Sequence, residues 1–464
     1  MNYDFAVIGG GSAGYAAART AADLGLKTVV VEGGTEIGGL CILRGCMPSK
    51  TLIESANRFL TLQHAGEFGL KAENIGFDGN AIIARKKRLI REFADYRREQ
   101  LETGKFDFLR GTATFADDHT ITVRLLDGSE QSLQARSFLI ATGSTISFPP
   151  VPGLAGAGCL TSDDVLDLVD IPPSVIVLGA GPVALEMAHY FNGLGRRVTV
   201  IQRSEQLLKG VDEDIAAAVE NAFRKRGVEV FTNTRLLRLE NGEKGHRVVF
   251  EHKDVEKTVE AASILNAMGR RPNTASLGLD QAGVEKMGAS IKINRSQQSS
   301  SSHIFAAGDC CGPFEVVHIA IEQGELAARN AARVLNGEAP LEMMDYRLKL
   351  YAVFTEPQVA AVGLSESEAR ANGREILTAT YPFNDHGKSL VMNETEGFVK
   401  LLADKTTREI LGGSVVGPHA SDLIHEVVVA MRFHATAAQF AAIPHYHPTL
   451  SEIWTYPASE LAEL

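Results

Sequence analysis

Two stretches of the chain, residues 5–32 and residues 175–202, share one pattern of apolar and polar positions. Each has a short run of β-branched apolar residues, a glycine-rich turn, a longer helical run and a second β-branched run. This order predicts strand, helix and strand, the crossover unit of a parallel sheet. The first glycine and the last residue of the second strand are equally far apart in both stretches. The pattern therefore predicts an α/β protein with two similar domains.

Breaks in this pattern predict the domain boundaries. Residues 147–153 are rich in proline, which cannot continue a helix or a central strand. Residues 269–273 mark a second crossing between domains, and beyond about residue 341 strand-like runs alternate with amphipathic helical runs. This last segment is predicted to form an α+β domain. The predicted division is 1–149, 150–271, 272–341 and 342–464.

Composition and charge exclude several classes of partner. The chain has 464 residues, 45% hydrophobic and 22% charged, as in an ordinary globular protein. A net charge of −11 argues against nucleic acid or an anionic membrane as a partner. No apolar run reaches the roughly 18 residues that a membrane span needs, and no basic leader precedes the first strand. Five cysteines are too few for a secreted disulfide scaffold, so we expect a cytoplasmic protein.

The first glycine turn predicts a dinucleotide site. Gly9, Gly11 and Gly14 lie between a predicted strand and a predicted helix, and Glu32 ends the second strand. Glycines at these positions allow a tight turn, close approach of a pyrophosphate and close helix–strand packing. The helix N-terminus faces the phosphate charge, and the Glu32 carboxylate can accept hydrogen bonds from a ribose diol. The alternative is a purely structural glycine turn.

The second glycine turn differs from the first in its third residue and at the end of its second strand. Its three positions are Gly179, Gly181 and Ala184. The strand ends in Gln202 followed by Arg203, where a carboxylate would repel a 2′-phosphate. Arg203 can pair with such a phosphate, and Lys209 is a second candidate. These residues favour NADP(H) over NAD(H), although Arg203 can equally be a solvated surface charge.

Two dinucleotide sites in one chain indicate an electron relay, in which one nucleotide stays bound as FAD and NAD(P)H visits the other site. Cys41 and Cys46 follow the first site, and no histidine or further cysteine lies nearby to complete a metal site of about four ligands. Pro48 is suited to a first helical turn, which would place Cys46 at a helix N-terminus. The helix dipole and Lys50 would there favour a reactive thiolate. The pair therefore predicts redox chemistry over a structural or metal-binding role.

The sequence around these cysteines resembles a known family. Cys-x4-Cys followed by Met-Pro-Ser-Lys, after a FAD fingerprint, resembles the class I pyridine nucleotide-disulfide oxidoreductases, and the resemblance covers nearly the whole chain. It implies two Rossmann-like domains and a C-terminal α+β dimerisation domain. The FAD domain would comprise 1–149 and 272–341, the NAD(P) domain 150–271 and the dimerisation domain 342–464.

The same resemblance assigns further cofactor residues. It places Asp309 on the ribityl chain and Ala113 near the adenine of FAD, and it pairs Lys50 with Glu186 beside the flavin ring. Without the resemblance, Glu186 would be interpreted as a charged side chain on the solvated face of a helix. The other residues that it places near the cofactors are Gly39, Thr142, Gly143 and Gly269.

Near the C-terminus, His447 and Glu452 match the family's catalytic base and the carboxylate that orients it. A histidine before proline is otherwise usually an extended loop residue. An imidazole poised near neutral pH can take a proton from a thiol and return it. The family supplies this base from the partner subunit, so the resemblance implies a homodimer with shared active sites.

The substrate would be a small dithiol or disulfide, or a lipoyl group. The C-terminal sequence is most similar to the lipoamide dehydrogenase branch, and the nicotinamide half resembles the mercuric reductase branch. The alternatives are an NADPH-dependent reductase of another small disulfide or of a metal ion, a flavin–dithiol redox sensor, and an NADH oxidase. No resident metal is expected. The adjacent Cys310 and Cys311 are interpreted as small core residues, and His419 and His425 as surface or packing residues.

Overall fold

The structure is a computed structural model that describes residues 2–243 and 245–464. The chain forms two compact units. The first contains Met1–Thr51, Asn80–Ser147 and Gly269–Asp345, and the second contains Leu52–Gly79, Phe148–Met268 and Tyr346–Leu464. Among the described residues, no helix combines the length and the apolar character needed to cross a bilayer.

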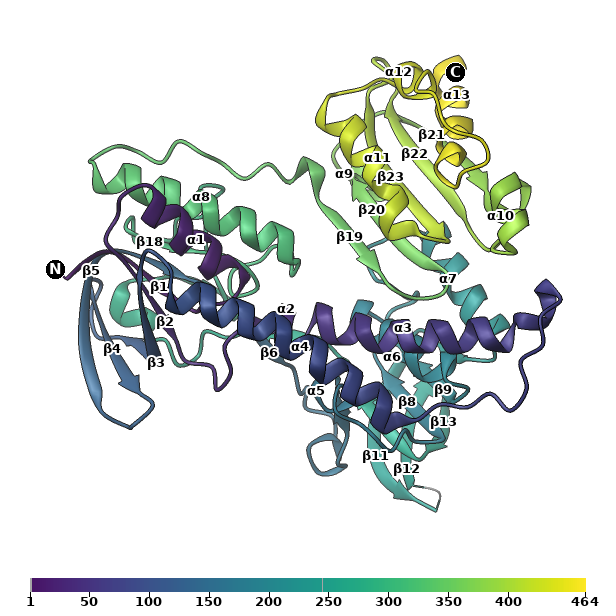
Figure 1. Cartoon of the computed structure of the whole chain (residues 1–464), viewed down its shortest axis with the longest axis horizontal. Coiled ribbons are helices and arrows are strands. Elements are labelled where there is room, and N and C mark those ends of the chain that lie inside the picture. Colours follow the sequence, from purple (N-terminus) through teal and green to yellow (C-terminus); the bar gives the residue numbers. More distant parts are fainter. Residues whose placement is uncertain (1, 244) are drawn as a thin grey trace. The chain divides into compact units, whose positions relative to one another are not determined.

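The first unit is built on a parallel sheet with the strand order β3-β2-β1-β5-β18. Its strands are β1 (Tyr3–Ile8), β2 (Thr28–Glu32), β3 (Asp107–Phe115), β5 (Glu130–Ile140) and β18 (Ile304–Ala306). The helices α1 (Ser12–Asp23) and α8 (Val317–Leu335) pack against each other beside this sheet (Figure 1). Small residues allow the close packing, because a Cβ atom on Gly324 of α8 would lie 2.3 Å from the carbonyl oxygen of Ala13.

Further elements of the first unit extend from this sheet. β4 (Thr120–Leu125) pairs antiparallel with the extended ends of β3 and β5. α2 (Gly39–Leu43) and the first turn of α3 (Cys46–Gln63) follow β2, and α4 (Gly79–Glu102) precedes β3. β6 (Ser144–Ile146) pairs with β15 (Arg270–Pro272), and β16 (Lys286–Met287) pairs with β17 (Ser290–Ile291).

The second unit repeats the parallel architecture, with the strand order β10-β9-β8-β14-β7. The strands are β7 (Leu160–Thr161), β8 (Ser174–Leu178), β9 (Arg197–Ile201), β10 (Glu229–Phe231) and β14 (Ser263–Asn266). The helices are α5 (Ser162–Val165), α6 (Pro182–Gly193) and α7 (Glu213–Lys225). A separate antiparallel sheet contains β11 (Thr234–Gly242), β12 (Gly245–His252) and β13 (Val255–Ala261). The predicted pair of strand–helix–strand units is thus confirmed as β1-α1-β2 and β8-α6-β9.

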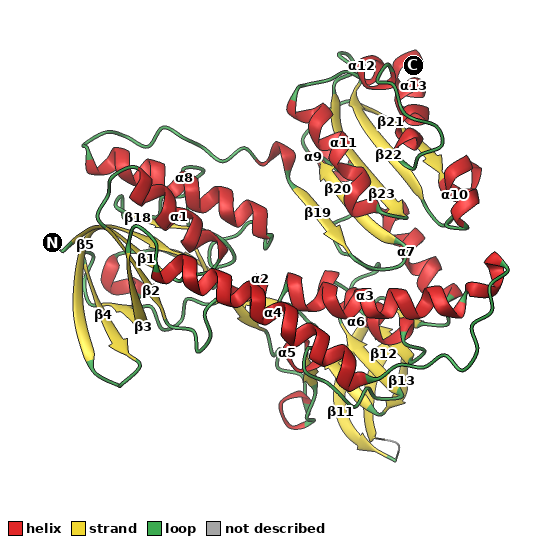
Figure 2. Ribbon diagram, viewed as in Figure 1, coloured by secondary structure: helices red, strands yellow, loops and turns green. Residues whose placement is uncertain are grey.

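The C-terminal part of the second unit is an antiparallel sheet covered by helices, as the predicted α+β pattern requires. Its strand order is β19-β20-β23-β22-β21, and α11 packs on β20 and β23 while α13 packs on β21 and β22 (Figure 2). The strands are β19 (Leu350–Val353), β20 (Gln358–Gly363), β21 (Ile376–Pro382), β22 (Phe398–Asp404) and β23 (Ile410–Gly417). The helices are α9 (Glu366–Ala371), α10 (Gly387–Met392), α11 (Ala420–Arg432), α12 (Ala437–Ala441) and α13 (Thr455–Glu463). Trp454 lies in the core of this domain, where its indole N–H donates to the Leu423 carbonyl at 3.0 Å.

The four-segment division of the chain remains a prediction. Residues 52–79, which that division places in its first segment, group with the second unit. One contact of this segment involves a buried histidine: His189 of α6 donates through Nε2 to Asn57 of α3 at 2.7 Å. Arg226 donates to Nδ1 of the same imidazole at 3.1 Å. Burial, with the Arg226 charge, lowers the pKa of His189 well below its usual value, so a neutral ring makes both contacts.

A buried lysine joins strand β22 to two other elements of the second unit. The Lys400 side chain is 1% exposed, and its Nζ lies 2.8 Å from Asp214, 3.0 Å from Asp212 and 3.0 Å from Glu366. Asp212 precedes α7 and Glu366 begins α9, so one ammonium group connects both helices to the sheet. Buried charges are tolerated only when they are paired in this way.

We predict that Lys400→Met lowers the free energy of unfolding by about 3–5 kcal/mol, because it leaves the carboxylates without their cation. The matched control is Lys405→Met, which removes the exposed Lys405–Glu375 pair at 3.2 Å and should cost about 0–1 kcal/mol. Urea denaturation of both variants measures the difference. Equal urea midpoints for the two variants would contradict the structural role of Lys400.

Candidate active site

The first glycine turn has the geometry of a phosphate-binding loop. Gly9 has φ +108°, and a Cβ atom there would lie 2.4 Å from the carbonyl oxygen of Ala141. A Cβ atom on Gly14 would lie 1.8 Å from the carbonyl oxygen of Gly9, so only glycine fits the contact between helix and loop. Gly11 caps α1 and supplies no side-chain hydrogen bond to the first-turn N–H groups. The positive end of α1 is therefore open to an anion.

The residues around this loop fit FAD. Glu32 lies at the end of β2, where its carboxylate accepts hydrogen bonds from the N–H groups of Gly10 at 2.7 Å and Gly34 at 2.5 Å. This carboxylate lies beside the loop, where a ribose diol of the dinucleotide would lie. Gly39 begins α2, and a Cβ atom there would lie 2.6 Å from Cα of Gly11, so two backbone segments meet without side chains between them.

The other predicted cofactor residues of the first unit lie in its strands or next to them. Asp309 follows β18 and accepts a hydrogen bond from the Ser144 hydroxyl at 2.6 Å. Arg270 in turn donates through Nε to that hydroxyl at 2.8 Å. Thr142 and Gly143 follow β5, and the Thr142 hydroxyl donates to the Asn273 carbonyl at 2.8 Å. Ala113 is buried in β3, and Gly269 precedes β15 and accepts a hydrogen bond from the N–H of Ser147 at 3.0 Å.

The second glycine turn has the same geometry as the first. Gly179 has φ +106°, and a Cβ atom there would lie 2.4 Å from the carbonyl oxygen of Ala267. Gly181 caps α6 without a side-chain hydrogen bond, and Ala184 is fully buried in that helix. Gln202 follows β9 and is half-buried, while Arg203 and Lys209 are exposed. Among the residues that the structure describes, neither cation pairs with a carboxylate.

The two predicted redox cysteines lie side by side. α3 begins at Cys46, as the sequence pattern predicts, and Cys41 lies in α2. A hydrogen bond between the two side chains, followed by burial and by negative charge on Cys46, raises the pKa of Cys41, while the positive charge of Lys50 acts in the opposite direction. Cys41 therefore holds a proton that a base must remove, and the helix N-terminus favours negative charge on Cys46.

Glu186 is buried in α6 and accepts a hydrogen bond from the N–H of Phe354 at 3.1 Å. A solvated helix charge is therefore the wrong interpretation of this residue. Lys50 and Glu186 belong to different units, and their pairing remains a prediction.

The predicted proton-transfer pair forms in the second unit. His447 Nδ1 lies 3.0 Å from Glu452 Oε2. The Glu452 side chain is 13% exposed, whereas the His447 side chain is 79% exposed. A carboxylate at Nδ1 keeps that nitrogen protonated and leaves Nε2 free to act as a base. His445, two residues earlier, forms a similar pair with Glu426 at 3.0 Å, but its side chain is only 7% exposed.

Sequence reasoning missed two residues next to this chemistry. The Arg97 guanidinium lies 4.2 Å from the ring centre of Tyr15, and its Nε and Nη1 atoms are buried with no hydrogen-bond partner among the described residues. Burial lowers the pKa of Arg97, and the charges of Tyr15 and Cys41 oppose that shift. The second is His386, which is fully buried beside Glu452. Arg97 lies in a highly charged helix, and His386 lies in a loop without periodicity, so no pattern distinguished either one.

The remaining candidate clusters are not assigned a role in this chemistry. Cys310 and Cys311 are buried, and their thiols donate to backbone carbonyls, as expected of core residues. Asp118, His119 and His303 bring possible metal-ligand atoms within 4.8 Å of one another. However, the two imidazoles stack at 4.1 Å with an angle of 17° between their planes, so a single cation cannot lie in the plane of both rings.

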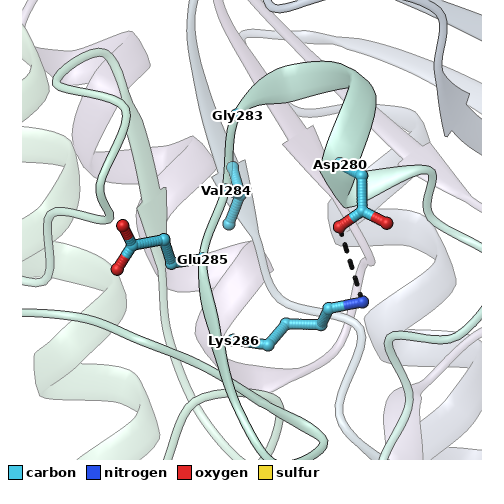
Figure 3. A pocket seen from close by; sticks show the side chains of 5 residues that line it. All are labelled: Asp280, Gly283, Val284, Glu285 and Lys286. Carbon is cyan, nitrogen blue, oxygen red and sulfur yellow. Dashed lines mark ion pairs between the residues drawn. The ribbon is translucent and has the colours of Figure 1, made fainter.

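A shallow pocket of about 410 Å³ lies in the first unit (Figure 3). It is lined by Asp280, Gly283, Val284, Glu285 and Lys286, and Asp280 pairs with Lys286 at 3.7 Å. None of the predicted site residues lines this pocket, so it has no part in the proposed chemistry.

Comparison with known proteins agrees with this geometry. The family model of the pyridine nucleotide-disulphide oxidoreductases matches residues 3–324, and the model of their dimerisation domain matches residues 350–458. A dihydrolipoyl dehydrogenase of Geobacillus stearothermophilus is 34% identical to the chain, and the alignment covers 99% of the chain and 95% of that relative. A dihydrolipoyl dehydrogenase of Bacillus subtilis is 35% identical, and the alignment covers 99% of the chain and 96% of that relative. The crystal structure of LpdA from Mycobacterium tuberculosis superposes with a TM-score of 0.88 at 30% identity, covering 99% of both chains. A HOCl-induced flavoprotein disulfide reductase from Escherichia coli, solved as a Cu(II) complex, superposes with a TM-score of 0.85 at 26% identity, also covering 99% of both chains.

The chain belongs to the pyridine nucleotide-disulphide oxidoreductase family. Its fold is the family's mixed α/β arrangement with a C-terminal dimerisation domain, which supports a homodimer. It is a FAD-dependent disulfide oxidoreductase, an enzyme that acts on a sulfur group with a pyridine nucleotide as the other partner.

Proposed function

We propose that Cys41 and Cys46 are the redox-active pair of this enzyme and exchange two electrons with a small dithiol or disulfide substrate. The observation that carries the proposal is the hydrogen bond between the two side chains at the N-terminus of α3, near the charge of Lys50. The loop of Gly9, Gly11 and Gly14 would hold FAD, which would supply the hydride chemistry that connects the cysteine pair to the nicotinamide. In dithiol oxidation, the substrate thiolate attacks the Cys41–Cys46 disulfide at Cys41, and Cys46 leaves as a thiolate that the helix dipole stabilises.

His447 and Glu452 are proposed to move the proton in this exchange. Glu452 fixes the imidazole so that Nε2 can take a proton from a thiol or return it. The high exposure of His447 is consistent with its serving Cys41 of the other subunit in a homodimer. Exposed apolar side chains of the matched dimerisation segment support such an association: Val429, Phe433, Ile443 and Tyr446.

The favoured substrate is a lipoyl group or a similar small dithiol, because the chain is similar to dihydrolipoyl dehydrogenases over nearly its whole length. The second candidate is an NADPH-dependent reductase of another small disulfide or of a metal ion, which the exposed Arg203 favours. The sparse cysteines are consistent with work in the cytoplasm. The two candidate functions are separated by comparing the turnover of dihydrolipoamide with NAD⁺ or NADP⁺ with the reduction of glutathione disulfide by NADPH. Faster turnover of glutathione disulfide would overturn the lipoyl assignment.

NADP(H) is the proposed nucleotide. Gln202 directly follows β9, at a position where a carboxylate would repel a 2′-phosphate, and Arg203 comes next without a carboxylate partner among the described residues. Gly179, Gly181 and Ala184 would hold the pyrophosphate.

We predict that Arg203→Glu lowers kcat/KM for NADPH by about 10- to 100-fold, since a charged hydrogen bond contributes about 1.5–3 kcal/mol. Activity with NADH should change little, because NADH has no 2′-phosphate. The control is Arg197→Glu, which changes an exposed arginine at the opposite end of β9. The measurement is anaerobic reduction of the bound flavin by each nucleotide. An equal loss with both nucleotides would show that Arg203 is not a 2′-phosphate contact.

A further inference from the structure

A second histidine faces the carboxylate that orients His447. His386 Nε2 lies 3.5 Å from Glu452 Oε1, whereas His447 Nδ1 lies 3.0 Å from the other carboxylate oxygen. His386 is fully buried, in the segment between the short helical turn Phe383–Asp385 and α10. Glu452 thus lies between one buried imidazole and one exposed imidazole of the same subunit.

The contacts of His386 determine which of its nitrogens carries the proton. Nδ1 lies 2.9 Å from the hydroxyl of Ser389, which is also fully buried. A hydroxyl can donate or accept, but a carboxylate only accepts. If Ser389 donates to Nδ1, the proton of the neutral ring is on Nε2 and points to Glu452. The opposite tautomer would place a lone pair against the carboxylate and is disfavoured.

Burial keeps His386 neutral. It lowers the pKa of this imidazole, and the opposing charge of Glu452 does not restore it. The other titratable groups that face the ring are His447, whose charge also lowers the pKa, and Tyr456 of α13, whose ring packs edge-on at 6.4 Å. At neutral pH the ring is therefore uncharged, and its Nε2 faces Glu452 at 3.5 Å, longer than an ordinary hydrogen bond, with no hydrogen-bond partner of its own among the described residues.

We propose that His386 is a positioning residue, which holds the Glu452 carboxylate in the rotamer that orients His447. This inference rests on the proposed function, because it needs His447 to be the proton-transfer group. Glu452 makes one contact to each imidazole, so loss of His386 removes the buried ring that one carboxylate oxygen faces and allows the side chain to turn away. His447 would then lose the partner that fixes its tautomer.

The test compares His386→Met, which keeps the bulk of the side chain, with His386→Gln, whose amide N–H can replace Nε2–H. His386→Met should lower kcat for dithiol oxidation about tenfold. This is a part of the ~10²–10⁴-fold rate enhancement that a general acid–base group contributes. His386→Gln should restore most of this activity. Dye reduction by NAD(P)H, which needs no thiol proton transfer, should stay unchanged in every variant.

A double-mutant cycle makes the result specific. If His386 acts through Glu452, His386→Met adds little to Glu452→Gln, and additive losses would overturn the proposal. An unchanged kcat in His386→Met would also overturn it. If His386→Met does not fold, His386→Gln is compared with His386→Asn, whose shorter amide cannot reach Glu452. Equal activity of these two variants would overturn the inference.

Two controls separate this inference from the proposed function. His64→Met removes an exposed histidine–glutamate pair, His64 with Glu67 at 3.0 Å, and should have no effect on turnover. His447→Gln tests the proposed function itself. If His447→Gln leaves dithiol oxidation intact, the proposed function is wrong. If His447→Gln loses dithiol oxidation while His386→Met keeps full activity, only the positioning role of His386 is wrong.

Discussion

Cys41→Ser should lower dithiol–disulfide turnover by about 10⁴-fold or more while dye reduction by NAD(P)H survives, because removal of a nucleophile removes the covalent pathway. Cys41 lies in hydrogen-bond contact with Cys46 at the start of α3, and serine at this position cannot form the disulfide. The dye takes electrons from the flavin and does not need the cysteine pair. Parallel assays of both activities on one preparation make the measurement.

The matched control is Cys159→Ser, which changes a half-buried cysteine in the other unit. This variant should keep both activities. Loss of dye reduction in Cys41→Ser would indicate damage to the flavin site, and a second preparation with Cys46→Ser would then test the pair. Persistent disulfide turnover in Cys41→Ser would show that the pair is wrongly assigned.

The second large effect is expected at His447. His447→Gln should lower kcat for dithiol oxidation by about 10²–10⁴-fold, the usual contribution of a general base, and leave dye reduction intact. His445→Gln is the matched control, because His445 also pairs with a glutamate but is largely buried. Comparable losses in the two variants would contradict the choice of His447.

The same variant tests whether the site is shared between subunits. In a hybrid dimer of Cys41→Ser and His447→Gln subunits, one site combines an intact Cys41 with an intact His447 from the other chain. Activity should therefore reappear when the two inactive variants are co-expressed. A hybrid that stays inactive would place the cysteine pair and its base in the same subunit.

The sequence predicted those features whose residue type and spacing follow directly from backbone geometry. Gly9 and Gly179 occupy turns with nearly equal φ, and each would place a Cβ atom against a carbonyl oxygen of a neighbouring strand end. Only glycine fits such contacts, so the two loops could be identified from the amino-acid sequence alone. The start of α3 at Cys46 was likewise predicted from Pro48, which fits a first helical turn.

Residues that act through tertiary contacts could not be predicted in this way. His386 meets Glu452 only because the loop before α10 folds against the segment before α13, and a single buried histidine leaves no periodic pattern. In the sequence, Lys400 is a single polar residue within an apolar strand, and its three carboxylate partners come from distant parts of the chain. The proposed preference for NADP(H) depends on Arg203, whose exposed side chain fits either a phosphate site or a solvated surface.

The most direct test of the central claim is an anaerobic titration of the purified protein with a chemical reductant. If Cys41 and Cys46 form a redox-active disulfide, each subunit should take up two electron pairs, one for the flavin and one for the disulfide. Cys41→Ser should take up a single pair. Uptake of a single pair by the unmodified protein, equal to that of the variant, would contradict a redox-active disulfide at Cys41 and Cys46.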